Sequence, residues 1–214
     1  MKKVLLIQIR PEDEAADNEL DAFVKFGGLS RESIHRVRSD REPIPDVNLD
    51  DYAGVIVGGG PSNLSDKDKT PEVLRIEQGV FRLLDQVIDK DIPYLGACSG
   101  LGLLVARMGG VMSKERYSED VGAITLQLTD DGKTDPLLSD LPASFRAFCG
   151  HKESAQAVPE GAVLLASSAT CPVQLLRVKK NIYATQFHPE LDTEGIVLRI
   201  NVYRHAGYFP PEDA

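Results

Sequence analysis

Cys98 is the residue whose surroundings most clearly point to chemistry. It stands in Gly96-Ala97-Cys98-Ser99-Gly100, between the apolar residues 93–95 and an apolar helical run over residues 101–108. Flanking glycines let a nucleophile occupy a tight strand-to-helix turn, because they carry no Cβ that would clash. The N-terminus of the following helix favours the thiolate, which is the attacking form. A small buried cysteine is the alternative, and the strand–turn–helix context favours a nucleophile.

A base and its partner follow near the end of the sequence, in Gln186-Phe187-His188-Pro189-Glu190. A catalytic thiol needs a base within hydrogen-bond reach, and that base needs an orienting group. His188 and Glu190 are two residues apart, so an extended segment directs both side chains to the same side. A lone structural histidine is the alternative. Together with Cys98, the segment predicts a Cys98, His188 and Glu190 triad.

A third segment, Gly58-Gly59-Gly60-Pro61, follows the apolar residues 54–57. Glycine allows the backbone to approach a ligand and to present N–H groups to a developing oxyanion. Taken alone, an ordinary Gly-Pro turn is the favoured interpretation. A phosphate-binding loop is excluded, because no Gly-Lys-Ser/Thr follows and no G-x-G-x-x-G opens a helix here.

The elements that must position these residues begin with an α/β pattern. Short β-type runs at residues 4–9, 33–37 and 54–57 are interleaved with helical patterns. The first helix is predicted over residues 18–26, with Asn18 as N-cap and Gly27-Gly28 as its end. A long amphipathic helix follows, with Pro71 in its first turn.

The second half of the chain is richer in β patterns. Predicted strands cover residues 122–128, 145–149, 163–166, 173–178 and 182–187, and a closing helix covers 193–204. The acidic, proline-containing residues 207–214 are predicted to form a surface strap. We expect one three-layer α/β domain over residues 1–214, with the later strands added to one edge or face of its sheet.

Composition excludes several classes of function. A formal charge of −9 and a pI near 5.0, without a basic stripe, argue against nucleic-acid binding. No apolar stretch approaches the roughly 20 residues needed to span a membrane. The 3 cysteines are odd in number and lack metal-like spacing, which argues against a disulfide framework. We therefore expect a cytoplasmic protein without a membrane or nucleic-acid partner.

The three segments, in this order, resemble the class I (triad) glutamine amidotransferases. The resemblance rests on Gly59-Gly60-Pro61, on the Cys98 pentapeptide and on the His188 segment, and it covers nearly the whole chain. Residues 150–153, 171–174 and 183–186 look most like the glutaminase domain of GMP synthase and its free-standing relatives. The resemblance implies a flavodoxin-like parallel sheet flanked by helices, with additional antiparallel strands.

The same resemblance implies roles for individual residues. Cys98 is the nucleophile, His188 the general base and acid, and Glu190 the residue that orients His188. The backbone N–H groups of Gly60 and Ser99 form the oxyanion hole, with Gly59 in the same substrate-binding loop. The implied reaction converts glutamine to glutamate and ammonia through a thioester, without a metal or other cofactor.

Two departures from the family pattern keep alternatives open. The family usually has a substrate-contacting glutamine where this chain has Gly102, which favours a γ-glutamyl peptide hydrolase as the alternative. No S-G-G-x-D-S loop of an ATP-pyrophosphatase is present in these residues, so ammonia used for biosynthesis would pass to a separate synthetase subunit. A third alternative is a non-catalytic regulatory module, against which the intact triad argues.

Overall fold

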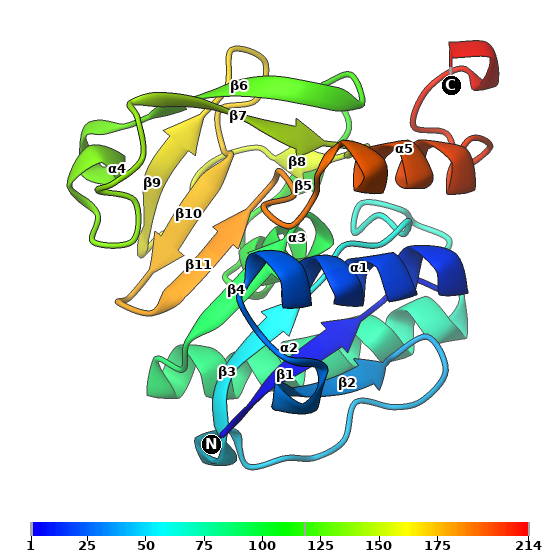
Figure 1. Cartoon of the computed structure of the whole chain (residues 1–214), viewed down its shortest axis with the longest axis vertical. Helices are drawn as coiled ribbons and strands as arrows, with labels where there is room; N and C mark the ends of the chain where they lie inside the picture. The colour runs from blue at the N-terminus through cyan, green and yellow to red at the C-terminus, as the bar shows by residue number, and fades with distance from the viewer. Residues whose placement is uncertain (1, 118, 214) are drawn as a thin grey trace.

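A nine-stranded sheet forms the centre of the computed structural model, which describes residues 2–117 and 119–213 (Figure 1). The strand order is β2-β1-β3-β4-β11-β10-β9-β6-β7, and β5 and β8 form a separate two-stranded sheet. The strands are β1 (Lys3–Gln8), β2 (Ile34–Arg38), β3 (Tyr52–Val57), β4 (Tyr94–Ala97), β5 (Met112–Ser113), β6 (Gly122–Leu128), β7 (Ser144–Cys149), β8 (Ser154–Ala155), β9 (Ala162–Ser167), β10 (Leu175–Val178) and β11 (Ile182–Thr185).

The direction of the strands divides the sheet into two parts. β2, β1, β3, β4 and β11 are mutually parallel, in the order typical of flavodoxin-like sheets. β10, β9, β6 and β7 continue the sheet from β11 through antiparallel pairs. The predicted fold class is therefore confirmed, with the additional antiparallel strands at one edge of the parallel sheet.

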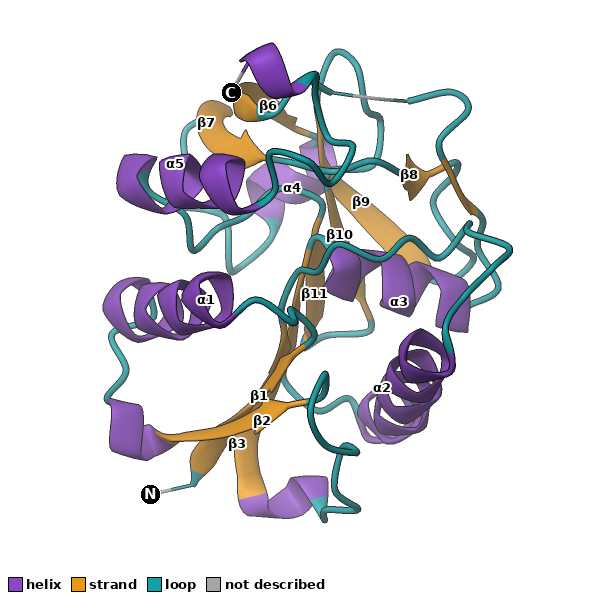
Figure 2. Ribbon diagram, turned by 90° about the vertical axis from the view of Figure 1, so that its right-hand side faces the viewer, coloured by secondary structure: helices purple, strands orange, loops and turns teal. Residues whose placement is uncertain are grey.

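Helices cover both faces of the sheet. α1 (Asp13–Phe26) and α5 (Thr193–Val202) lie on one face, whereas α2 (Pro71–Lys90) and α3 (Ser99–Arg107) lie on the other (Figure 2). The short helix α4 (Asp130–Thr134) contacts β9. None of the helices within the described ranges is long and apolar enough to cross a membrane.

The bounds of the helices correct two of the predicted ends. α1 begins at Asp13 rather than after Asn18, because buried Ala15 and Ala16 extend its core-facing side without adding bulky apolar residues to the pattern. Its predicted end is confirmed, since Gly27 is the C-cap. α5 ends at Val202, two residues before the predicted end at residue 204.

The glycines around Cys98 allow α3 to approach the sheet closely. A Cβ on Gly100 would lie 2.4 Å from the carbonyl oxygen of Val57 in β3. A Cβ on Gly96 would lie 2.7 Å from the backbone of Gly100 itself. Both distances are well below van der Waals contact and involve backbone atoms, which have little freedom to move.

Replacing Gly100 with alanine should destabilise the protein by about 1–3 kcal/mol, because the added methyl group forces α3 away from β3. The free energy of unfolding in urea measures this loss. Gly150→Ala is the matched control, since a Cβ there meets only Val121 at 3.6 Å. Equal unfolding free energies for the two variants would contradict the packing described here.

Candidate active site

Parallel pairing of β4 with β11 brings the predicted nucleophile and base to the same edge of the sheet. Ala97 pairs with Thr185, and the Cys98 N–H donates to the carbonyl oxygen of Thr185 at 2.7 Å. Because parallel strands end side by side, the residues just after β4 and β11 become neighbours. Cys98 and His188 thus meet although they are far apart in the sequence.

Cys98 has an unusual backbone conformation. Its φ is 53° and its ψ is −99°, between the end of β4 and the first residue of α3. L-residues rarely adopt positive φ, and such strain is common at functional sites. The predicted strained strand-to-helix turn is therefore present, and it holds the thiol at the N-terminus of α3.

His188 is held between Cys98 and Glu190. Its Nδ1 atom lies 2.8 Å from Glu190 Oε1, and its backbone N–H donates to the Phe148 carbonyl at 2.8 Å. The predicted extended geometry for this segment is wrong, because β11 ends at Thr185 and residues 189–190 form a turn. The turn, rather than strand alternation, directs Glu190 onto the imidazole.

The electrostatics of these three groups favour an ion pair. Burial disfavours the Cys98 thiolate, but the hydrogen bond and charge of His188 outweigh it and lower the pKa of Cys98. Burial disfavours the imidazolium too, whereas Glu190 and Cys98 favour it and raise the pKa of His188 to about 9. Despite burial, His188 lowers the pKa of Glu190 to about 2. These shifts favour the Cys98 thiolate and the His188 imidazolium over their neutral forms.

The glycine loop lies against the same site. The Gly60 N–H donates to Ser99 Oγ at 2.9 Å, and Ser99 Oγ donates to the Gly60 carbonyl at 3.1 Å. The Gly59 N–H donates to Glu19 Oε1 at 3.2 Å. The role of this loop in oxyanion binding stays a prediction. For Gly60, this role requires the Ser99 hydroxyl to rotate away, because that hydroxyl now accepts the Gly60 N–H.

A buried ion pair that the sequence motifs did not indicate supports this loop. Arg10 Nε lies 2.9 Å from Glu19 Oε1, and the two side chains are only 4% and 0% exposed. Arg10 also donates to Tyr203 Oη at 3.2 Å, which connects the loop after β1 to the C-cap of α5. The sequence could have indicated that Glu19 has a buried partner, because it is a charged residue on the apolar side of α1 beside Leu20 and Phe23.

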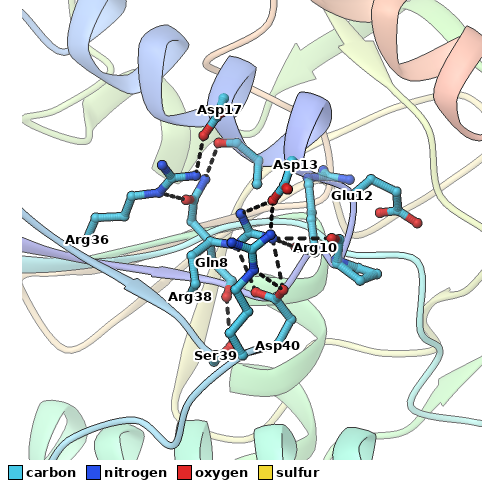
Figure 3. A network of polar contacts seen from close by, with 12 residues as sticks. Gln8, Arg10, Glu12, Asp13, Asp17, Arg36, Arg38, Ser39 and Asp40 are labelled. Atoms are coloured by element: carbon cyan, nitrogen blue, oxygen red, sulfur yellow. Dashed lines mark hydrogen bonds and ion pairs between the residues drawn. The ribbon is translucent and has the colours of Figure 1, made fainter.

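Arg10 belongs to a wider polar network at the carboxyl ends of β1 and β2 (Figure 3). Gln8 donates through Nε2 to Glu19 at 3.0 Å and accepts from Arg36 Nε at 2.5 Å. Arg38 donates to the Arg10 carbonyl at 3.2 Å and to Asp40 at 2.8 Å. The network fixes the backbone of Arg10, so its guanidinium is directed at Glu19 and the glycine loop.

Two small cavities flank Cys98. The first, called here the His188 cavity, is also lined by His188, Gly60 and Tyr208 and by residues of α5. The second, called the Gly102 cavity, is lined by Cys98, Gly60 and Tyr208 but not by His188. Its other lining residues are Ser62, Asn63, Ser99, Gly102, Met112, His151, Lys152, Glu153 and Gln186.

The C-terminal residues contact the site more closely than predicted for a surface strap. Tyr208 and Phe209 are half-buried and line the His188 cavity, and Tyr208 lines the Gly102 cavity as well. Lys152 donates to the Ala206 carbonyl at 3.1 Å, and its Nζ lies 4.6 Å from the centre of the Tyr208 ring. The predicted tail therefore covers Cys98; its last residue, Ala214, lies outside the described residues.

A second Cys, His and Glu cluster lies beside the Gly102 cavity. Potential metal-ligating atoms of Glu119, His151 and Cys171 are within 4.8 Å of one another. Glu119 already accepts hydrogen bonds from His151 at 2.9 Å and from Thr170 at 2.8 Å, and from Ser168 and Gln174. Burial raises the pKa of Cys171 to about 11, so this thiol is protonated and a poor metal ligand.

A protein-family model, "Glutamine amidotransferase class-I", matches residues 18–195. This chain belongs to the class I glutamine amidotransferases. The family model spans the glycine loop, the Cys98 elbow and the His188 segment, so the predicted membership is confirmed.

Curated relatives agree with membership in this amidotransferase family. The chain is 34% identical to GMP synthase [glutamine-hydrolyzing] of Thermosipho africanus over 154 residues, which are 72% of this chain and 26% of the relative. It is 29% identical to the enzyme of the same name from Streptococcus mutans over 170 residues, 78% of this chain and 29% of the relative. The chain thus spans less than a third of the length of these relatives.

Two solved amidotransferase structures share the fold. A glutamine amidotransferase from Thermotoga maritima has a TM-score of 0.76 at 19% identity, covering 95% of this chain and 84% of that one. A second, from Methylobacillus flagellatus, has a TM-score of 0.74 at 20% identity, and the match covers 94% of this chain and 76% of that one. At these identities the likeness establishes the fold alone.

His188→Asn should shift the pH profile of Cys98 alkylation upward. Burial raises the pKa of Cys98 and His188 lowers it most strongly, so removing the imidazole leaves burial opposed only by the weaker charges of His151 and Arg10. Alkylation should then need a pH above the ordinary thiol pKa of about 8.5, with a rate at pH 7 reduced about tenfold or more. Iodoacetamide labelling followed by mass spectrometry measures this profile at Cys98.

Cys171 is the internal control for this labelling, because its buried thiol should stay unmodified in the folded protein at neutral pH. An alkylation profile that is unchanged by the His188 substitution would show that the imidazole does not control the thiol.

Proposed function

We propose that the protein hydrolyses the side-chain amide of glutamine, or a γ-glutamyl amide, through a thioester on Cys98. The observation that carries the proposal is the position of His188, which lines the same cavity as Cys98 and lies 2.8 Å from the Glu190 carboxylate. A buried thiolate, a base and an orienting carboxylate are the groups that acyl transfer through cysteine requires.

The reaction has two halves. The Cys98 thiolate attacks the γ-carbonyl carbon, and the His188 imidazolium donates its proton to the leaving nitrogen as the carbon–nitrogen bond breaks. His188, now neutral, takes a proton from water, and the resulting hydroxide attacks the thioester. Glutamate leaves, the Cys98 thiolate is restored, and Glu190 stabilises the imidazolium formed in the second half.

The negative charge on the carbonyl oxygen needs donors that are already in place. The Ser99 N–H belongs to the first residue of α3, and the N–H groups of a helix's first turn have no partner within the helix. The Gly60 N–H is the second proposed donor, once the Ser99 hydroxyl releases it. Each such donor lowers the barrier by about 2.7–4 kcal/mol.

Glutamine is the first candidate substrate because the relatives from Thermosipho africanus and Streptococcus mutans are named as glutamine-hydrolyzing GMP synthases. In this proposal a separate synthetase takes up the ammonia. The proposed hydrolysis itself assigns no step to a metal or organic cofactor, because thiolate, imidazole and backbone donors supply the nucleophile, the proton transfer and the charge stabilisation.

A γ-glutamyl amide is the second candidate substrate, and the surroundings of Gly102 favour it. A Cβ at this position would lie 3.1 Å from Leu64 and 3.2 Å from Met112. The glutamine that the family usually carries here cannot fit unless both side chains move. The Gly102 cavity therefore recognises its ligand through other groups, such as Asn63, Lys152 and Gln186.

Cys98→Ala should lower glutamate release by about 10⁴-fold or more, because no other group can form the thioester. Glutamate release from glutamine and from a γ-glutamyl dipeptide, measured on purified protein, tests the proposal and ranks the two substrates. Cys171→Ala is the matched control and should keep its activity. Glutamate release that survives the Cys98 substitution would refute the proposed mechanism.

A further inference from the structure

Arg199 is a buried cation that the proposed reaction does not use. It lies on α5 and is only 6% exposed. None of its three guanidinium nitrogen atoms has a hydrogen-bond partner among the residues that the structure describes. Burial of an unpaired guanidinium is costly, and such groups usually have a partner or bind a ligand.

The charges around Arg199 do not provide a dedicated counter-ion. Its electrostatic neighbours are Arg10, Glu19, Glu190 and Tyr203. Glu19 is already paired with Arg10, and Glu190 contacts His188. The second oxygen of Glu190, Oε2, is buried and has no hydrogen-bond partner in the described part of the chain. The ion pair of Glu190 within these residues is with His188 and does not include Arg199. Arg199 is therefore available to a ligand anion.

Arg199 lines the His188 cavity together with Cys98 and His188. This placement identifies which part of a substrate would reach it. His188 must donate its proton to the leaving nitrogen, so the leaving group has to lie on the His188 side of Cys98. The acyl part then occupies the Gly102 cavity on the other side, which His188 does not line.

We propose that the His188 cavity binds the leaving group of the substrate and that Arg199 binds a carboxylate on it. A guanidinium can donate two parallel hydrogen bonds to a carboxylate, which gives both affinity and orientation. The apolar side chains of Leu191, Ile196 and Ile200 line the same cavity and fit the aliphatic part of an amino acid.

The substrate class is then a γ-glutamyl amino acid, in which the amide nitrogen belongs to the departing amino acid. Hydrolysis consumes one water and gives glutamate and the free amino acid, with the proton from His188 on the new amine. This inference rests on the proposed Cys98 chemistry. Ammonia as leaving group would leave Arg199 without an anion.

Binding to the Cys98→Ala protein tests the site without turnover. γ-Glutamylglycine should bind about 10- to 100-fold more tightly than γ-glutamylglycinamide by calorimetry, because only the first carries the carboxylate for Arg199. Adding Arg199→Met should reduce this ratio to within about threefold. Adding Arg204→Met should preserve it, since Arg204 bonds to Asn201 outside the cavity.

Several outcomes would overturn the inference. Equal affinities of the two ligands for the Cys98→Ala protein would do so, and this comparison does not depend on the folding of the Arg199 variant. An affinity ratio of the two dipeptides that is unchanged by Arg199→Met would also overturn the inference. Weakened binding of glutamine by Arg199→Met, to the same extent as the dipeptide, would place the α-carboxylate rather than the leaving group at Arg199.

Turnover by the protein with Cys98 intact separates this inference from the proposed function. Hydrolysis of both dipeptides with equal kcat/KM and equal affinity would leave the Cys98 chemistry standing and remove the Arg199 site. A retained affinity difference without any hydrolysis would leave the Arg199 site standing and remove the Cys98 chemistry. A uniform fall in kcat for every substrate in Arg199→Met, with KM unchanged, would show that Arg199 positions Glu190 and would overturn the inference.

Discussion

The parallel pairing of β4 with β11 is the constraint on which the site depends. The hydrogen bond from the Cys98 N–H to the Thr185 carbonyl sets where both strands end, and the thiol and the imidazole follow from that register. A shift of register by one residue would reverse the face of every side chain on β11. The antiparallel strands beyond β11 stabilise this pairing from one side, and β3 stabilises it from the other.

Buried charge is the second organising feature of the site. The Arg10–Glu19 pair crosses from the loop after β1 to α1, accepts the Gly59 N–H through Glu19 and reaches Tyr203, the C-cap of α5, through Arg10. A buried pair of this kind adds little net stability, because desolvation offsets most of its attraction. Its effect here is geometric, since it links the glycine loop to Tyr203 at the end of α5. A second arginine, Arg199 of α5, lines the cavity that His188 also lines.

The two cavities beside Cys98 differ in the residues that line them. His188 borders one of them and Gly102 the other, and Cys98 lines both. Tyr208 borders both and brings the C-terminal residues over the nucleophile. Family membership is shared with proteins named as glutamine-hydrolyzing GMP synthases, and Arg199 of α5 supplies a buried charge to the cavity that His188 lines.

Sequence alone determined the features that depend on local pattern. Strand and helix periodicity, the glycines beside Cys98 and the His188 segment were all recognisable, because backbone geometry and strand ends are encoded by neighbouring residues. The motifs themselves grouped the triad, and the family resemblance supplied the flavodoxin-like arrangement of the sheet. Only the tertiary structure revealed that Glu190 reaches His188 through a turn, that Arg10 and Glu19 pair, and that Arg199 and Tyr208 border the thiol. The hydrogen bond between Arg10 and Tyr203 joins residues 193 positions apart, and such long-range burial rather than local preference decides which buried polar groups meet.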